Sequence, residues 1–258
     1  RCEMPKFIDL SVTFGVGVRK GDSEITYITH EETVQSRIVG MYGLKASDMD
    51  IRGGRYCAME KVSLTTHETS HLDAPWHYTP ISEGKPAKKI DEIPLEWCYG
   101  DGVVLDFHHK KAGERISAAE VESALKKINY KLKPWDIVLI RTDAYKHWGK
   151  PDYRDIHPGM TRESTLWLIE RGIKVMGIDA YGWDRPHKMM AEEVKKTGKK
   201  ELFWEGHFAG IEKEYLHLED LANLDKLPKP FGFKVIAFPI KIAGASAGWV
   251  RAVAMLED

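Results

Sequence analysis

The chain has 258 residues, of which 43% are hydrophobic and 30% charged, as in an ordinary globular protein with one large domain. Its net charge of −1 argues against nucleic acid or an anionic membrane as a partner, and no apolar run approaches the roughly eighteen residues of a membrane span. Three scattered cysteines without a Cys-x-x-Cys pair, and an amino terminus without an apolar signal core, predict a cytoplasmic protein with no disulfide framework.

The first elements in chain order are a strand, a turn and a polar excursion. Residues 6–12 have the apolar, β-branched character of a strand, and residues 15–22 are rich in glycine but lack the spacing of a phosphate-binding loop. Residues 29–55 are polar and contain four glycines, so we expect an excursion that packs over the functional site or a neighbouring subunit.

The densest chemical signal follows a second predicted strand, residues 56–66. The next eleven residues read His-Glu-Thr-Ser-His-Leu-Asp-Ala-Pro-Trp-His. The four candidate metal ligands in this stretch all have odd numbers: His67, His71, Asp73 and His77. Side chains two apart share a face of extended chain, and the proline rules out a helix interior, so these four side chains are predicted to converge. Imidazole with carboxylate predicts a divalent metal site, with zinc, manganese and iron as candidates.

The rest of the chain predicts alternating strands and helices. Strands are expected at 102–107, 136–141, 173–179, 234–240 and 249–256. Ser117 with Glu120 forms a capping box for one helix between them, and Thr161 caps another that stops at Gly172. Strands that alternate with helices require crossover connections and partly parallel pairing. The glycine-containing link between the last two strands is compatible with a tight hairpin, and nothing marks a linker, so a single domain over 1–258 is predicted.

The histidine-rich stretch resembles the cyclase family of metal-dependent hydrolases, which includes bacterial kynurenine formamidases and isatin hydrolases. That family carries His-x-Gly-Thr-His-x-Asp-x-Pro-x-His, and this chain keeps all of it except that Thr69 replaces the glycine and Ser70 the threonine. The resemblance extends to Asp-Leu-Ser near the start and to the closing stretch from Gly244. It implies an α/β protein with the swivelling β/β/α fold, a barrel-like mixed sheet flanked by helices, and a homodimer or homotetramer.

The same resemblance implies the remaining ligands. His207 and Glu219 occupy the positions that complete the family's metal site, whereas His217 is expected at the surface or behind the ligands. The set would hold one or two divalent ions, bridged by Asp73 if there are two, with zinc as the first candidate and manganese as the alternative.

The predicted activity is hydrolysis of an amide bond in an aromatic or cyclic small molecule such as N-formylkynurenine or isatin. Metal-bound hydroxide would attack the carbonyl, and His77 would deliver the proton to the leaving nitrogen. Trp76 and Trp183 are predicted to line a pocket for a flat ring, and Asp184, Arg185 or His187 to anchor a polar substrate group. The charged run at 188–200 is expected to be a solvated face.

Two other classes of protein fit part of the pattern. His71-x-Asp73 with the distant His207 matches the two-histidine, one-carboxylate triad of iron(II) oxygenases. A non-catalytic protein that binds a small molecule and uses the metal for stability is the third possibility. The surplus of candidate ligands favours the hydrolase.

Overall fold

The structure is a computed structural model that describes residues 4–15 and 24–256. The chain divides into two compact units, one formed by Arg1–Gly17 with Thr66–Asp258 and the other by Val18–Thr65. The single domain expected over residues 1–258 stays a prediction. Residues 16–22 of the predicted glycine-rich turn lie outside the described residues.

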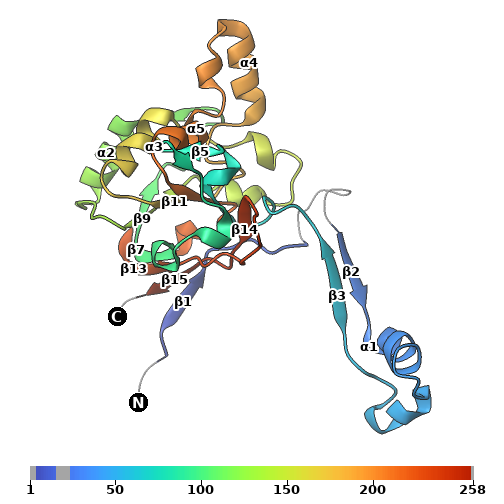
Figure 1. The fold of residues 1–258 in the computed structure, drawn as a ribbon. Helices are drawn as coiled ribbons and strands as arrows, with labels where there is room; N and C mark the ends of the chain where they lie inside the picture. Colours follow the sequence, from blue (N-terminus) through green and yellow to red (C-terminus); the bar gives the residue numbers. More distant parts are fainter. Residues whose placement is uncertain (1–3, 16–23, 257–258) are drawn as a thin grey trace. The chain divides into compact units, whose positions relative to one another are not determined.

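The larger unit is built on a nine-stranded mixed sheet that curls like part of a barrel (Figure 1). In spatial order its strands are β1 (Lys6–Asp9), β15 (Val253–Leu256), β13 (Phe231–Ile236), β7 (Tyr99–Asp106), β9 (Ile137–Arg141), β11 (Val175–Ile178), β12 (Leu216–Glu219), β4 (His71–Asp73) and β14 (Ala247–Trp249). The four neighbours β7, β9, β11 and β12 are parallel, and every other pairing is antiparallel. The predicted mixed α/β architecture with partly parallel pairing is confirmed.

The helices of this unit begin where the sequence predicts caps. In α2 (Ala118–Lys127) the Ser117 side chain accepts from the Glu120 amide while the Glu120 carboxylate accepts from the Ser117 amide. Thr161 caps α3 (Arg162–Ile169) in the same way. Two further helices are α4 (His187–Thr197), whose side chains are mostly exposed as expected for the charged run, and α5 (Glu205–Glu212).

The central strands are buried on both faces. Alternate residues of β7 and β9 contribute to two separate apolar clusters, as the period of two in a strand requires. One cluster is covered by α2 and α3 through side chains such as Val121 and Leu168. The other lies on the opposite face of the sheet and contains Leu72 of β4 and Leu218 of β12. Because Leu72 anchors β4 in this core, its neighbours His71 and Asp73 are directed to the opposite face.

The link between the last two predicted strands differs from the expected hairpin. β13 and β15 do pair antiparallel, but the residues between them leave and form β14, which adds to the far edge of the sheet beside β4. The alternation that predicts strands does not reveal which edge a three-residue strand joins, so this excursion was not predicted. It brings Ser246 and Trp249 next to the histidine-rich stretch.

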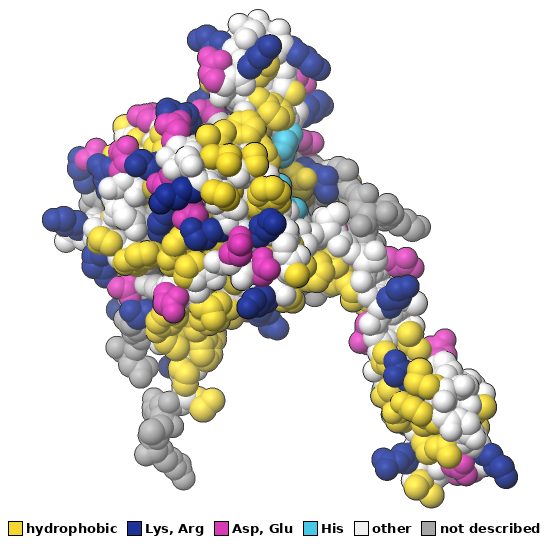
Figure 2. Space-filling view, viewed as in Figure 1, with side chains coloured by type: hydrophobic (Ala, Val, Ile, Leu, Met, Phe, Trp, Pro, Cys, Tyr) yellow, Lys and Arg dark blue, Asp and Glu magenta, His cyan; other side chains and the backbone are white. Residues whose placement is uncertain are grey.

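The smaller unit is a two-stranded antiparallel ribbon, β2 (Glu24–Ile28) with β3 (Met59–Ser63), joined by α1 (His30–Thr33) and two further helical segments, η1 (Val34–Val39) and η2 (Ala46–Arg52). Among its described residues only Thr33, Val34 and Ile38 are buried. Hydrophobic side chains are instead exposed over its surface (Figure 2): Tyr27, Val39, Met41, Tyr42, Leu44, Ile51, Tyr56 and Val62. That residues 29–55 pack over the functional site or a neighbouring subunit stays a prediction.

Two pairs of two-residue strands and several short 3-10 turns complete the described part of the chain. β5 (Ile81–Ser82) pairs with β6 (Lys85–Pro86), and β8 (Arg115–Ile116) with β10 (Gly159–Met160). Within residues 4–15 and 24–256, none of the helices has both the length and the apolar character that a bilayer crossing requires.

Candidate metal centre

The register of β4 against β12 assembles the heart of the site. His217 lies directly opposite Asp73 across the antiparallel pair, and Glu219 lies opposite His71. Cross-strand partners have Cβ atoms only about 5 Å apart, so one register fixes four ionisable side chains on one face. A shift by one residue would turn all four away, and the burial of Leu72 and Leu218 on the other face opposes such a shift.

Two turns bring further histidines to the same point. His67 lies in the turn before β4, and His77 ends the 3-10 turn η3 (Pro75–His77) that follows it. The extended geometry predicted for the whole stretch therefore holds only for β4, and the remaining convergence comes from the flanking turns. Asp73 is the meeting point of both turns and the strand.

Five imidazoles surround the Asp73 carboxylate. His67 Nδ1 and His71 Nε2 lie 2.8 and 3.2 Å from Oδ1, and three Nε2 atoms lie 3.1–3.8 Å from Oδ2, those of His217, His77 and His207. The Glu219 carboxylate completes the cluster, 3.2 Å from His217 Nε2, 3.5 Å from His207 Nε2 and 3.7 Å from His71 Nε2. The structure thus brings together every predicted metal ligand, the predicted catalytic histidine and, in addition, His217.

The polar atoms of this cluster fit a divalent cation. Both carboxylate oxygens of Asp73, His71 Nε2 and both ring nitrogens of His217 are buried, and none of these atoms makes a well-directed hydrogen bond to another described residue, although imidazole nitrogens lie close to the carboxylate. Buried polar atoms are otherwise almost always paired. Two groups of potential ligands share Asp73, one with His67 and His77 and the other with His207, His217 and Glu219. A carboxylate shared by two ligand groups matches a one-ion or a bridged two-ion site.

The electrostatics of the metal-free cluster separate its histidines into two kinds. Burial opposes the charge of His71, but the Asp73 carboxylate outweighs burial and raises its pKa to about 10. Burial likewise opposes the charge of His217, and hydrogen bonding to Asp73 and Glu219 raises its pKa to about 9. His77 and His207 are different, because burial lowers the pKa of His77 to about 4 and that of His207 well below its usual value.

The two carboxyl groups at the centre are held ionised. Burial would raise the pKa of Asp73, but the adjacent imidazoles, His71 above all, prevail and hold it well below the usual range. Burial also works against ionised Glu219, yet its contact with His217 lowers the pKa to about 2. Without a metal, protonated His71 and His217 therefore act as the counter-charges of two buried carboxylates.

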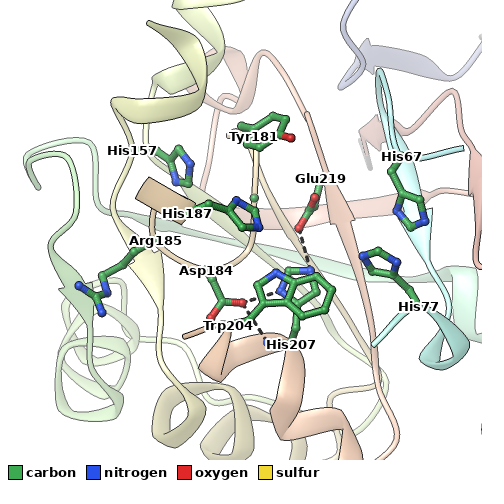
Figure 3. Close-up of a pocket in the computed structure, with 11 residues that line it drawn as sticks. His67, His77, His157, Tyr181, Asp184, Arg185, His187, Trp204, His207 and Glu219 are labelled. Carbon is green, nitrogen blue, oxygen red and sulfur yellow. Dashed lines mark hydrogen bonds and ion pairs between the residues drawn. The ribbon is translucent and has the colours of Figure 1, made fainter. Parts of the chain in front are cut away.

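His207 is oriented by Asp184 at the start of α5. The Asp184 carboxylate accepts from the amides of Gly206 and His207 and lies 2.5 Å from His207 Nδ1 (Figure 3). This carboxylate caps the helix and places the proton of His207 on Nδ1, which leaves the Nε2 lone pair for the cluster. Burial raises the pKa of Asp184 to about 6, so it is mostly ionised at neutral pH.

His71 is oriented by the turn that contains Thr69. His71 Nδ1 donates to the Thr69 carbonyl over 2.8 Å, so Nε2 faces Asp73 and offers its lone pair to a metal once its proton is released. Thr69 adopts φ = 59°, in the left-handed region that strongly favours glycine. The resembling family has glycine at this position, and the backbone conformation explains that preference. In this chain Thr69, a β-branched residue, adopts the left-handed backbone conformation of the turn.

A pocket opens beside the cluster and carries an aromatic wall (Figure 3). The Trp204 ring stacks on the His207 imidazole at a centroid distance of 4.1 Å and meets His77 edge to face at 5.1 Å. The residues that line this pocket are His67, His77, His157, Tyr181, Gly182, Asp184, Arg185, His187, Trp204, His207 and Glu219. All three residues expected to anchor a polar substrate group, Asp184, Arg185 and His187, are among them.

The two tryptophans predicted to bind substrate lie elsewhere. Trp183 is fully buried, stacks on His217 at 5.8 Å and donates its indole N–H to Thr165, so it supports the cluster from behind. Trp76 is 41% exposed, with the Lys89 ammonium over its ring, and is not among the residues that line the pocket. A tryptophan inside a ligand motif does not reveal which way its ring points.

Sequence reasoning missed three residues of the site. His217 carried a signal, because it is two residues before Glu219 and shares its face of β12, yet it was expected at the surface or behind the ligands. Trp204 also carried a signal, because it is an aromatic residue three positions before His207, whereas nothing in the sequence marks His157; both line the pocket. The iron triad of His71, Asp73 and His207 exists within the cluster, but His67, His217 and Glu219 give it more donors than such a triad has.

Comparison with known proteins assigns the family. The Cyclase family model matches residues 8–185, more than half of the chain. The chain is 24% identical over 193 residues to the kynurenine formamidase of Bacillus cereus, which covers 75% of this chain and 78% of that one. The isatin hydrolase A structure from Labrenzia aggregata is 25% identical with a TM-score of 0.72 and covers 98% of this chain and 94% of that one.

Further solved structures share the fold. Isatin hydrolase A from Ralstonia solanacearum has a TM-score of 0.74 at 21% identity and covers 98% of this chain and 92% of that one. A structure described as a potential metal-dependent hydrolase with cyclase activity has a TM-score of 0.64 at 18% identity, covering 99% and 100%. These likenesses confirm the predicted fold class. The chain belongs to the Cyclase family.

Proposed function

We propose that this chain is a metal-dependent hydrolase that cleaves an amide bond of an aromatic or cyclic small molecule of the N-formylkynurenine or isatin type. One observation carries the proposal: the buried carboxylate of Asp73 lies among five imidazoles beside a pocket with an aromatic wall. Relatives that are kynurenine formamidases and isatin hydrolases support the reaction class.

His67, His71 and Asp73 would hold one ion, and Asp73 with His207 and Glu219 a second. Nitrogen and carboxylate donors suit zinc, our first candidate, and manganese is the alternative. A divalent metal bound there supplies Lewis-acid polarisation of a carbonyl oxygen and activation of water. The burial of Asp73 and Glu219 strengthens their attraction for a cation, because a surrounding of low polarity screens charge weakly.

His77 is the proposed proton carrier. It lines the pocket, and burial lowers its pKa to about 4, so its ring is neutral at pH 7 and able to accept a proton. As water adds to the carbonyl carbon, its proton passes to the imidazole, and the same proton then reaches the nitrogen when the carbon–nitrogen bond breaks. General acid–base steps of this kind are typically worth about 10²–10⁴-fold in rate.

The pocket determines which amides fit. The Trp204 ring, fixed by its stacking on His207, presents a flat surface beside His77 on which an aromatic substrate ring can lie. Tyr181 and His187 lie 6.2 Å apart on the pocket wall and add further ring surface. The proposed partner is therefore a small molecule with a flat ring.

The direct test is hydrolysis of N-formylkynurenine and of isatin by protein stripped with a chelator and reloaded with zinc or manganese. We expect turnover only after reloading and a loss of about 10²–10⁴-fold in kcat for His77→Gln with its metal content unchanged. A His77→Gln enzyme with full turnover would remove the proton-carrier role. If metal removal lowers the stability of the protein but no amide is hydrolysed, the alternative of a non-catalytic binding protein is favoured.

We also propose a homodimer or homotetramer in the cytoplasm. The exposed hydrophobic side chains of the smaller unit, among them Tyr27, Met41 and Ile51, support a partner surface there. The scattered cysteines support a reducing compartment, since Cys57 and Cys98 are free in the structure. Light scattering of the purified protein measures the assembly directly.

A further inference from the structure

His157 is a buried histidine whose tautomer is fixed by its surroundings. Its side chain comes from the segment before β10, and the residue is 1% exposed. Its Nδ1 lies 2.8 Å from the carbonyl oxygen of Pro158. A carbonyl oxygen only accepts, so Nδ1 carries the proton, and in the neutral ring Nε2 carries a lone pair. Burial lowers the pKa of His157, which keeps the ring neutral.

The lone pair of Nε2 has no donor within the described residues. Nε2 is fully buried and unpaired there, and His157 lines the pocket beside the metal centre. In Figure 3 the His157 ring lies on the other side of Glu219 from His67 and His77. A buried acceptor without a donor is unfavourable, so a molecule in the pocket that donates a hydrogen bond to Nε2 would be favoured.

Gly182 keeps the space beside this acceptor open. A Cβ atom at Gly182 would lie 3.9 Å from His157 Cε1 and 4.0 Å from Glu219 Oε1, so any larger side chain there would extend into the region between them. The absence of a side chain at Gly182 therefore leaves room between the edge of the His157 ring and the carboxylate of Glu219.

We infer that His157 is a specificity-determining residue whose Nε2 accepts a hydrogen bond from the amide N–H of the substrate. This inference rests on the proposed amide hydrolysis and narrows its substrate class. A secondary amide, whether an N-formyl arylamine or a cyclic amide, carries that N–H, and a tertiary amide does not. The pocket therefore selects secondary over tertiary amides, because a tertiary amide leaves the buried acceptor unpaired.

The test uses matched substrates that differ only in the N–H: isatin with N-methylisatin, and formanilide with N-methylformanilide. The ratio of kcat/KM for each pair is measured for the metal-loaded wild type, His157→Phe and His157→Gln. The added methyl group affects every enzyme sterically, so the change in the ratio between enzymes is the readout. Glutamine keeps an acceptor oxygen near the position of Nε2, and its amide can still donate to the Pro158 carbonyl.

We expect the wild type to favour the N–H substrate by roughly tenfold or more, His157→Phe to lose most of that preference, and His157→Gln to recover it. If His157→Phe does not fold, His157→Met removes the strong acceptor at a similar size. A preference that is unchanged in the variant without an acceptor would overturn the inference and leave the hydrolase assignment in place.

A binding measurement distinguishes a failure of the proposed hydrolysis from a failure of the proposed role of His157. Calorimetric titration of isatin and N-methylisatin into the metal-loaded wild type and His157→Phe reports affinity without turnover. If no amide is hydrolysed but the wild type alone prefers isatin, the proposed reaction is wrong and the role of His157 stands. Equal affinities for both compounds, or no binding of either, would overturn the role of His157.

Discussion

Thr69 sets the geometry of the turn from which His71 is oriented. Its carbonyl accepts from His71 Nδ1, and its φ of 59° is a conformation that a β-branched residue adopts at a cost. The strain of this conformation lowers the stability of the folded protein by about 1–3 kcal/mol. Glycine would remove the strain, but its greater flexibility in the unfolded chain would offset about 0.5–1 kcal/mol of the gain.

Thr69→Gly is therefore expected to raise the free energy of unfolding by about 1 kcal/mol and to leave metal affinity unchanged. Denaturant unfolding of the metal-free protein measures the first quantity, and chelator competition the second. Glu83, at φ = 51° and outside the metal centre, provides a matched control as Glu83→Gly. Lower stability of Thr69→Gly would show that the threonine side chain stabilises the turn in a way that outweighs its strain.

Asp184, which also lines the pocket, acts on the metal centre through His207. In Asp184→Asn the carbonyl oxygen can still cap α5, but the amide cannot accept the proton of His207 Nδ1 as the carboxylate does. Loss of such a partner typically costs about 10–100-fold in metal affinity, and we expect that range here. Chelator competition measures it, with Glu193→Gln, which alters the contact of pocket-lining Arg185, as the control. Wild-type affinity in Asp184→Asn would contradict this role.

The residues of the site differ in how far the sequence reveals them. His67, His71, Asp73 and His77 are predictable because they crowd into one stretch with a recognisable spacing. His157 is not, because its role depends on a carbonyl that fixes its tautomer and on burial beside a distant loop. Such properties arise from tertiary contacts, and no local pattern encodes them.

At the level of elements, the placement of α5 controls His207. Gly210 on this helix packs against the Tyr78 ring so closely that a Cβ atom would come within 2.0 Å of Tyr78 Cε2. Tyr78 cannot move aside easily, because its hydroxyl donates to the Tyr215 carbonyl and its ring is buried. The absence of a side chain at Gly210 therefore allows the helix to approach the turn that carries His77.

Gly210→Ala is expected to destabilise the protein by about 1–3 kcal/mol and to weaken metal binding, because α5 has to shift and carry His207 with it. Thermal unfolding and chelator competition measure the two effects. Ile211→Ala, at a position that is 46% exposed on the same helix, should change neither by much. A Gly210→Ala protein as stable as the wild type would show that the turn and helix can separate freely.

Elements with strong local signals are predictable, and those defined by pairing are not. Capping side chains locate α2 and α3, and apolar runs locate β7, β9 and β11, within a few residues. β14 has only three residues, too few to show an alternation of apolar and polar side chains. It forms because its backbone can pair with the free edge of β4. The position of β14 is decided by its pairing with β4, which is distant in the sequence. The local sequence therefore indicated only a hairpin between the last two strands.

On the scale of the molecule, the metal centre is the largest concentration of buried charge in the described residues. With pKa values of about 10 and 9, His71 and His217 are protonated at pH 7 in the metal-free protein. A metal must displace these protons to bind to the imidazoles, so protons compete with the metal at any pH below the two pKa values. The competition weakens as the pH rises towards them. His77 and His207, with lowered pKa values, do not compete at neutral pH.

Metal affinity is therefore expected to rise between pH 7 and pH 9, and binding at pH 7 to release protons from His71 and His217. Calorimetric titration of zinc in two buffers with different ionisation enthalpies counts the protons released. Binding without proton release at pH 7 would contradict the charge distribution described here.

The central claim is that the Asp73 cluster binds metal, and elemental analysis of the purified protein tests it most directly. We predict about one or two ions of zinc or manganese per chain in the wild type, and a sharp loss in Asp73→Asn, because every ligand group shares this carboxylate. No stoichiometric metal after incubation with either ion, or wild-type content in Asp73→Asn, would contradict the account.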